Sequence, residues 1–217
     1  CSLFNGLNRT IIGYFGLPLL YTVPKETWGH WLHEFSMMAV APNSHFFANN
    51  RLFAEQIHWQ TGVRVRVLSP LALYLDISYA PARLEEVLVP EPREACVLYC
   101  LLDAFRPADY PFRFLRKADT DRKLSTFATF RAVVLFPHDF ALMTFYELYR
   151  MAIPLFMPSH LSKYIFPYSA SVPLLDFVPK EVMAKPGRPE HSPLSMTSGA
   201  ALRYWAKSID FFSFPGV

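Results

Sequence analysis

The chain has 217 residues, of which 52% are hydrophobic and 18% charged, and its formal net charge is +3. This composition supports a folded core and excludes a disordered chain, and the length fits one domain or two small ones. The net charge is too small, and the Lys and Arg residues too dispersed, to indicate nucleic-acid binding. The sequence starts at Cys1 without an initiator Met, so we expect a piece of a longer chain whose localisation, cytoplasmic or endomembrane-associated, stays open.

We expect neither a membrane span nor a disulfide framework in this sequence. A span needs roughly 18 to 20 consecutive apolar residues, and polar side chains interrupt the nearest candidate, 131–157. Three Cys are too few for a framework of disulfides. The redox compartment is therefore undetermined at this point.

The first half of the chain alternates strand patterns with helix patterns. The segment 27–39 carries apolar residues at helical spacing after Thr27, a residue type that caps helices. A second helix is expected after Asn50, and Gly62 suits the left-handed position at its end. In chain order we expect one bent strand or two short strands over 11–23, a helix over 27–39, a strand over 45–48, a helix over 51–60 and a half-exposed strand over 63–68.

The second half begins with a proline-containing segment, 78–93, which has little hydrophobic period and is expected to be a linker. The apolar run 95–102 is typical of a buried strand, in which Cys96 and Cys100 would lie roughly 13 Å apart, too far for a disulfide. After it we expect a helix over 119–130, a strand over 132–136, a helix over 142–151, a short strand at 155–156, a short helix up to 165, an irregular connection over 168–195 and an amphipathic helix over 202–212.

This alternation predicts the α/β class, with mainly parallel sheets in Rossmann-like domains. Two domains are expected, 1–80 and 81–217, because the proline-containing segment lies between them.

The most informative stretch is 131–159, which predicts a buried strand, a turn, a helix and a second short strand. Asp139 lies in the turn, and Glu147 follows in the helix. A strand that leads into a helix places backbone N–H groups at a crevice where anions bind. The two carboxylates are therefore expected to flank a phosphate-bearing ligand.

Several enzyme signatures are absent from the sequence. His33-Glu34 begins like the zinc protease helix motif, but Met37 stands where the second imidazole would be. The sequence has no G-x-S-x-G elbow, no G-x-G-x-x-G loop and no Walker loop. The reaction is expected to need no metal.

Around the two acids, the sequence VVLFPHDFALMTFYELYRMAIPLFMPS resembles the donor-binding half of GT-B glycosyltransferases. It is most similar to the retaining enzymes with an E-x7-E motif and to divergent algal or protist glycosyltransferase-like proteins. In that family the first acid ends a strand, a helix follows at once, and the second acid lies inside the helix. Asp139 and Glu147 match the two acids, and Ile153-Pro154 matches the end of the small-residue-x-Pro step. The close resemblance covers about 131–167.

The resemblance implies sugar transfer from a nucleotide sugar, which is a substrate and not a cofactor, to a carbohydrate or glycoconjugate acceptor. It makes 1–80 the late part of an acceptor-side domain and 81–217 the donor-binding domain. Asp139 would contact hydroxyls of the donor sugar, and Glu147 would accept hydrogen bonds from ribose hydroxyls. Further donor contacts are expected from Arg116, Lys117, His138 and the helix start at Leu142, Met143 and Thr144.

The sequence departs from the family pattern in two ways. The first acid is Asp rather than Glu, and 140–143 (FALM) replaces a glycine-rich turn. Two rival interpretations therefore stand beside the enzyme: a non-catalytic GT-B-like domain that binds a glycan or a protein, and a different Rossmann-like enzyme with another phosphate ligand.

Simpler roles also stand beside the functional ones. Glu147 would pair with Arg150 on the surface, and Asp139 would cap the helix. The pair 116–117 would be a solvated basic pair in a loop. Tyr204 and Trp205 would serve either packing or a carbohydrate platform.

Overall fold

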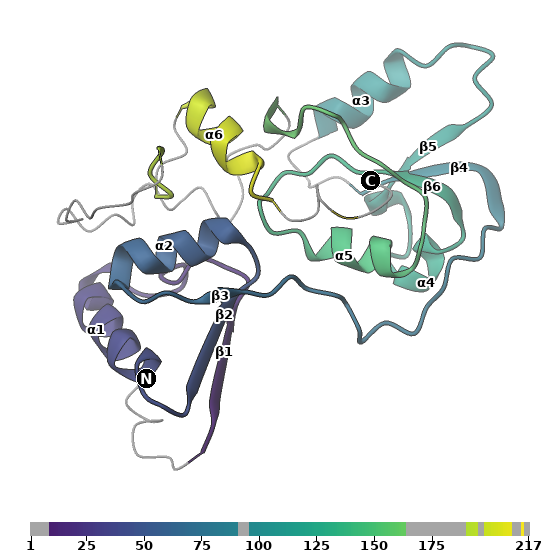
Figure 1. Ribbon diagram of the computed structural model, residues 1–217. Helices are drawn as coiled ribbons and strands as arrows, with labels where there is room; N and C mark the ends of the chain where they lie inside the picture. Colours follow the sequence, from purple (N-terminus) through teal and green to yellow (C-terminus); the bar gives the residue numbers. More distant parts are fainter. Residues whose placement is uncertain (1–8, 91–95, 164–189, 195–197, 210–213, 215–217) are drawn as a thin grey trace. The chain divides into compact units, whose positions relative to one another are not determined.

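A computed structural model of the chain describes residues 9–90, 96–163, 190–194, 198–209 and 214. These residues form a Rossmann-like α/β fold with two separate sheets, both entirely parallel (Figure 1). The predicted α/β class and the parallel sheets are confirmed.

Contacts between residues divide the chain into two units, and each is described by itself. Unit 1 holds the described residues of 9–69, 139–141 and 190–209, and unit 2 holds those of 70–138, 142–163 and Phe214. The first change of unit along the chain falls between Ser69 and Pro70, whereas the sequence suggests a boundary near residue 80.

Unit 1 is built on a three-stranded sheet in the order β1 (Ile11–Phe15), β2 (Ser44–Ala48) and β3 (Arg66–Val67). Helix α1 (Trp28–Ala39), preceded by the 3-10 turn η2 (Lys25–Thr27), connects β1 to β2, and α2 (Arg51–Thr61) connects β2 to β3. Both helices contact β2 and each other, so they cover the same face of the sheet (Figure 1). The helix α6 (Gly199–Ala206) also belongs to unit 1.

The core of unit 1 is aromatic. The rings of Phe15 and Phe46 lie 5.6 Å and 5.3 Å from the ring of Phe35, a fully buried residue of α1. Gly13 lies next to the ring of Phe46, where an added Cβ would come within 2.2 Å of a ring carbon. An additional methyl group would displace this ring, so the glycine inside β1 has a packing reason.

The sequence predicts both N-terminal helices of unit 1 to within one residue. Asn50 caps α2 by accepting a hydrogen bond from the backbone N–H of Phe53 at 3.0 Å, and Gly62 ends the helix with a φ of 78°. Thr27 precedes α1 as predicted, but its hydroxyl donates to the carbonyl of Pro24. Thr27 therefore occupies the predicted N-cap position without making a side-chain capping hydrogen bond.

Other predictions for unit 1 are only partly right. The segment 11–23 contains one strand, β1, and continues in turns, while 63–68 contains only the two-residue β3. Helix α6 begins earlier than predicted because Ser198 caps it, accepting from the N–H of Ala201 at 3.1 Å. The predicted helix end at 210–212 lies outside the described residues, as does most of the predicted irregular connection 168–195.

Unit 2 contains a four-stranded sheet in the order β5 (Arg113–Arg116), β4 (Arg83–Val89), β6 (Phe130–Val134) and β7 (Leu155–Phe156). Along the sequence, β5 is added on one side of β4, and β6 and β7 are then added on the other side of β4. The strand order therefore reverses between β4 and β6. In open parallel sheets, ligands bind beyond the carboxyl ends of the strands at such a reversal. The other elements are α3 (Cys96–Ala104), η4 (Lys117–Asp119), α4 (Leu124–Phe127), α5 (Met143–Arg150) and η5 (Leu161–Lys163).

The predicted linker at 78–93 is wrong, because this segment contains β4, one of the two central strands. Three charged residues in 83–86 conceal the strand pattern in the sequence. The predicted strand at 95–102 is also wrong, since this run forms α3. A short apolar run has no period that separates a buried strand from a helix. Cys96 and Cys100 therefore lie about one helical turn apart.

Two further helix predictions in unit 2 are largely wrong. The segment 119–130 is α-helical only at α4, because Arg122 has a positive φ of 62° that is incompatible with a continuous helix. After 159, the described part of the segment forms only the three-residue η5.

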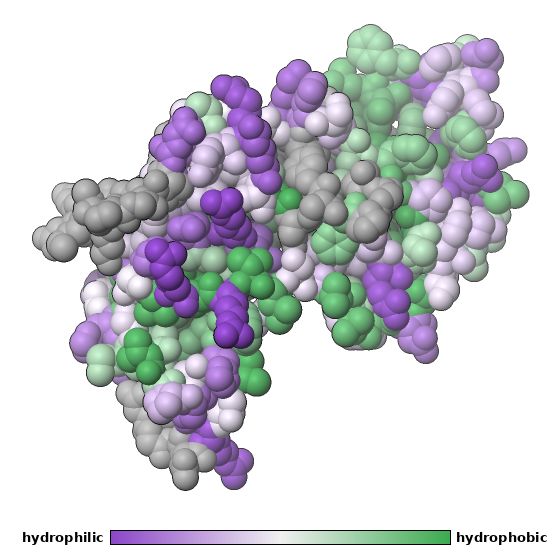
Figure 2. Space-filling model, in the orientation of Figure 1, coloured by the Kyte–Doolittle hydropathy of each residue, from purple (hydrophilic) through white to green (hydrophobic). Residues whose placement is uncertain are grey.

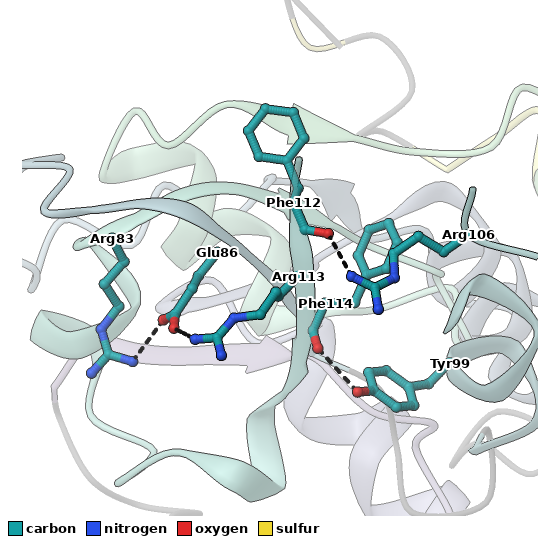
Figure 3. A network of polar contacts seen from close by, with 7 residues as sticks. All are labelled: Arg83, Glu86, Tyr99, Arg106, Phe112, Arg113 and Phe114. Atoms are coloured by element: carbon teal, nitrogen blue, oxygen red, sulfur yellow. Dashed lines mark hydrogen bonds and ion pairs between the residues drawn. The ribbon is translucent and has the colours of Figure 1, made fainter. Parts of the chain in front are cut away.

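Side chains from α3 and the loop after it cover the outer edge of β5, an edge strand of its sheet (Figure 3). The hydroxyl of Tyr99 donates to the carbonyl of Phe114 at 3.0 Å. The guanidinium of Arg106 donates to the carbonyl of Phe112 at 3.2 Å. An edge whose carbonyls are occupied is a poor template for pairing with another chain.

Glu86 links β4 to β5 at the surface of unit 2. Its carboxylate accepts hydrogen bonds from both Arg83 and Arg113 (Figure 3).

Apolar side chains gather over α3 (Figure 2), and Phe105, the residue after α3, is 81% exposed. No helix among the described residues is long and apolar enough to cross a membrane.

Candidate functional site

The strand–turn–helix–strand predicted for 131–159 is present as β6, a turn, α5 and β7. Val89 on β4 is paired with Arg116 on β5, and Val134 on β6 is paired with Phe156 on β7. Because the strands are parallel and their last residues are aligned, their carboxyl ends form one edge of the sheet. Arg116 is the last residue of β5 at this edge, a strand that the sequence pattern does not predict. His138 lies in the turn after β6.

Helix α5 begins at Met143, four residues after Asp139, and not directly after the first acid as the family resemblance implies. Leu142 occupies the N-cap position and supplies no side-chain hydrogen bond. Met143 and Thr144 are therefore the first residues of a helix whose start has no side-chain cap. Backbone N–H groups at such a helix start are able to bind anions.

Asp139 is not the cap of α5, so the simpler role considered for it is wrong. It is buried, with 7% of its surface exposed, and its Oδ1 accepts from the N–H of Phe140 at 2.6 Å. The next carbonyl, that of Phe140, accepts from the side-chain amide of Asn50 at 3.0 Å. These contacts attach 139–141 to the start of α2 in unit 1. The other predicted site residues belong to unit 2.

Glu147 lies in the second turn of α5 and is half-buried. Its Oε1 accepts a hydrogen bond from the hydroxyl of Tyr74. This hydrogen bond, with smaller contributions from burial and from the carboxylate charge, raises the pKa of Tyr74 to about 12. Glu147 and Arg150 form no ion pair in the described part of the chain, which contradicts the simpler role as a surface ion pair.

Arg116 makes the bidentate contact expected of a guanidinium, but with a carboxylate of its own chain. Its Nε and an Nη each donate to Asp119 at 2.9 Å, and this pairing lowers the pKa of Asp119. The guanidinium also lies 5.4 Å from the ring centre of Tyr99. The amine of Lys117 lies 5.7 Å from the ring centre of Phe127. Both cations are thus held at the carboxyl edge by neighbouring side chains.

Trp205 is a packing residue. It is fully buried, and its indole N–H donates to the carbonyl of Ser192 at 3.3 Å. Tyr204 is half-buried, with its ring 5.3 Å from that of His191. Trp205 is therefore unavailable as a carbohydrate platform.

Two apolar cavities lie in unit 2, with volumes of about 440 Å³ and 710 Å³. The larger lies on the sheet face that carries Val87, Ala132 and Val134. Neither cavity is lined by Glu147 or Arg116. Among the residues with described positions, no cluster of three or more His, Cys, Asp or Glu side chains could hold a metal ion.

Sequence reasoning missed Tyr74 and Asn50 as partners of the motif. Tyr74 lies in an irregular segment before β4, and no periodicity or spacing connects it with Glu147. Asn50 is recognisable as a helix cap, but its contact with Phe140 spans 90 positions of the chain. Only the folded structure reveals such partners.

The fold described above defines a Rossmann-like α/β protein. Comparison of the chain with family models, curated proteins and solved structures finds no match.

Proposed function

We propose that the chain is a glycosyltransferase of the GT-B type whose unit 2 binds a nucleotide-sugar donor. The start of α5 carries this proposal. It lies after β6, next to the reversal of strand order, and it has no side-chain cap. Such a position favours the diphosphate of a nucleotide, because the backbone N–H groups and the positive end of the helix dipole face the ligand.

Glu147 supports a nucleotide over a simple anion. Its carboxylate already accepts a hydrogen bond from a hydroxyl group, that of Tyr74. A ribose offers hydroxyl groups of the same kind. The family resemblance assigns Glu147 to this contact, one to two helical turns from the residues proposed to hold the diphosphate.

In the proposed reaction, the bond between the anomeric carbon of the sugar and the diphosphate oxygen breaks, and the electron pair leaves with the diphosphate. An acceptor hydroxyl forms the new bond to the anomeric carbon, and its proton passes to the leaving diphosphate. Negative charge develops on the leaving diphosphate, so donors and cations there stabilise the transition state. The start of α5 would supply N–H groups, and Arg116 and Lys117 would supply the positive charge.

Two observations favour the second candidate, a non-catalytic GT-B-like domain that binds a glycan or a protein. Bulky residues occupy 140–143 in place of a glycine-rich turn, which restricts the approach of a phosphate. Asp139, the expected contact to the donor sugar, is buried and accepts a hydrogen bond from its neighbour. Donor binding by the domain distinguishes the two candidates.

Isothermal titration of the full chain with UDP-, GDP- and ADP-sugars tests the proposal. We expect one of the three nucleotides to bind, and Glu147→Gln to weaken it about tenfold or more, because a hydrogen bond to a charged group is lost. Glu55→Gln, on helix α2 of unit 1, is the matched control and should leave the affinity unchanged. Absence of binding by the wild-type chain would reject the enzyme and favour the non-catalytic domain.

A further inference from the structure

Tyr74 is an exposed tyrosine with a specific polar contact. Its side chain belongs to the irregular segment between β3 and β4 and is 65% exposed, so the ring is not a core residue. Its hydroxyl nevertheless donates to Oε1 of Glu147 on α5. An exposed ring whose tip meets a half-buried carboxylate requires an explanation other than packing.

The segment that carries Tyr74 is attached to unit 2 at several points. The N–H of Leu75 donates to the carbonyl of Ala72 at 3.1 Å, which forms a turn around Tyr74. Ala72 is 5% exposed, so this turn is anchored in the interior. Further along, the N–H of Tyr79 donates to the carbonyl of Met151 at 2.9 Å, directly after α5. The hydroxyl of Tyr74 is therefore presented to α5 by an ordered turn.

We propose that Tyr74 is a positioning residue for Glu147, which it holds so that the second carboxylate oxygen faces a ribose hydroxyl of the bound nucleotide. The inference rests on the proposed function and extends it by one residue. A carboxylate has two oxygens that each accept hydrogen bonds, so donation by Tyr74 to Oε1 leaves Oε2 for the ligand.

The physical benefit lies in the flexibility of glutamate. A free Glu side chain has three rotatable bonds, and ordering it on binding costs affinity. The hydroxyl of Tyr74 orders the carboxylate before the ligand arrives. Because the pKa of Tyr74 is raised to about 12, its hydroxyl remains protonated and keeps donating at neutral pH.

This role predicts recognition of the ribose and not only of the phosphates. The protein should therefore bind a ribonucleoside diphosphate more tightly than the 2′-deoxy or the 3′-deoxy counterpart. In Tyr74→Phe this preference should shrink, because the carboxylate is no longer fixed. A purely structural role of Tyr74 would not change the preference for ribose.

The experiment is isothermal titration of the full chain with UDP, GDP and ADP, followed by the 2′-deoxy and 3′-deoxy forms of the one that binds. We expect Tyr74→Phe to weaken binding of the ribonucleotide by roughly three- to tenfold, the range of one hydrogen bond. Binding of the deoxy form that lacks the recognised hydroxyl should weaken much less. Tyr79→Phe is the matched control. Its hydroxyl donates to the carbonyl of Arg131 at 2.8 Å, away from Glu147, and its loss should leave both affinities unchanged.

The outcomes separate the inference from the proposed function. If the wild-type chain binds no nucleotide, or if Glu147→Gln has no effect, the proposed function fails and the inference fails with it. If the wild-type chain binds and Glu147→Gln weakens binding, an unchanged Kd and an unchanged ribose preference in Tyr74→Phe overturn the inference alone. Tighter binding by Tyr74→Phe also overturns it, since the hydroxyl would then compete with the ligand.

Discussion

Glu147 lies on a helix whose neighbouring residues Tyr146 and Leu148 are buried, and its half-buried carboxylate needs a hydrogen-bond partner. Helical spacing suggests Arg150, but the partner is Tyr74, 73 positions away in the sequence. The contact raises the pKa of Tyr74 from 10.0 to about 12. Because this pKa is higher in the folded protein than in the unfolded chain, the contact stabilises the fold fully below pH 10 and is lost as the pH rises through about 12.

This pKa gives the first prediction at the scale of the residue. In the folded protein, Glu147→Gln should lower the pKa of Tyr74 toward 10.0, because the carboxylate that raises it is gone. The measurement is phenolate absorbance during titration with base, with Tyr74→Phe identifying the step that belongs to Tyr74. Identical titration curves for the wild-type chain and Glu147→Gln would show that the two side chains do not interact in solution.

Arg116 gives the second residue-scale prediction, because Asp119 competes with a phosphate for its guanidinium. Asp119→Asn removes the competing charge and should strengthen binding of the nucleoside diphosphate by about two- to fivefold, as expected for an exposed ion pair. Asp121→Asn is the control, since Asp121 lies near Lys123 and not near Arg116. Isothermal titration measures the effect. Weaker binding by Asp119→Asn would mean that the pair must stay intact for the ligand.

At the scale of the element, Asn50 joins helix α2 to the turn that contains Asp139. One end of its amide caps the helix through Phe53, and the other end donates to Phe140, while the side chain is 1% exposed. The two hydrogen bonds are separable by mutation, because Ser at this position keeps a capping oxygen, adds no charge and lacks the amide N–H that reaches Phe140.

We therefore predict that Asn50→Ala lowers the free energy of unfolding by about 2–4 kcal/mol, the sum of a lost cap and an unsatisfied buried carbonyl. Asn50→Ser should cost less than Asn50→Ala, since its hydroxyl keeps the cap. Urea denaturation followed by circular dichroism measures both. Equal losses for the two variants would show that the cap contributes little to α2.

Elements with several local signals are the ones that the sequence predicts well. Helix α2 has a cap and a C-terminal glycine, and the fold confirms both. Strand β7 is predicted at its two residues because Pro154 separates it from α5. Strand β4 and helix α3 lack such signals: β4 carries three charged residues, and α3 is a continuous apolar run over 96–102. Tertiary contacts decide these two elements, so pattern reasoning assigns them wrongly.

At the scale of the whole molecule, alternation of strands and helices is enough to predict two parallel sheets and the α/β class. The candidate site is only partly predictable from the sequence. The order of residues places the start of α5 after β6 and Glu147 inside the helix. It does not show that Asp139 belongs to unit 1, that Asp119 engages Arg116, or that Tyr74 meets Glu147, because these depend on contacts across the fold.

A crystal structure of the full chain with the nucleoside diphosphate that it binds would locate the donor. We predict diphosphate oxygens within hydrogen-bond distance of the N–H groups of Met143 and Thr144, and a ribose hydroxyl on Oε2 of Glu147. Electron density for the nucleotide at another place, or none at a saturating concentration, would contradict it.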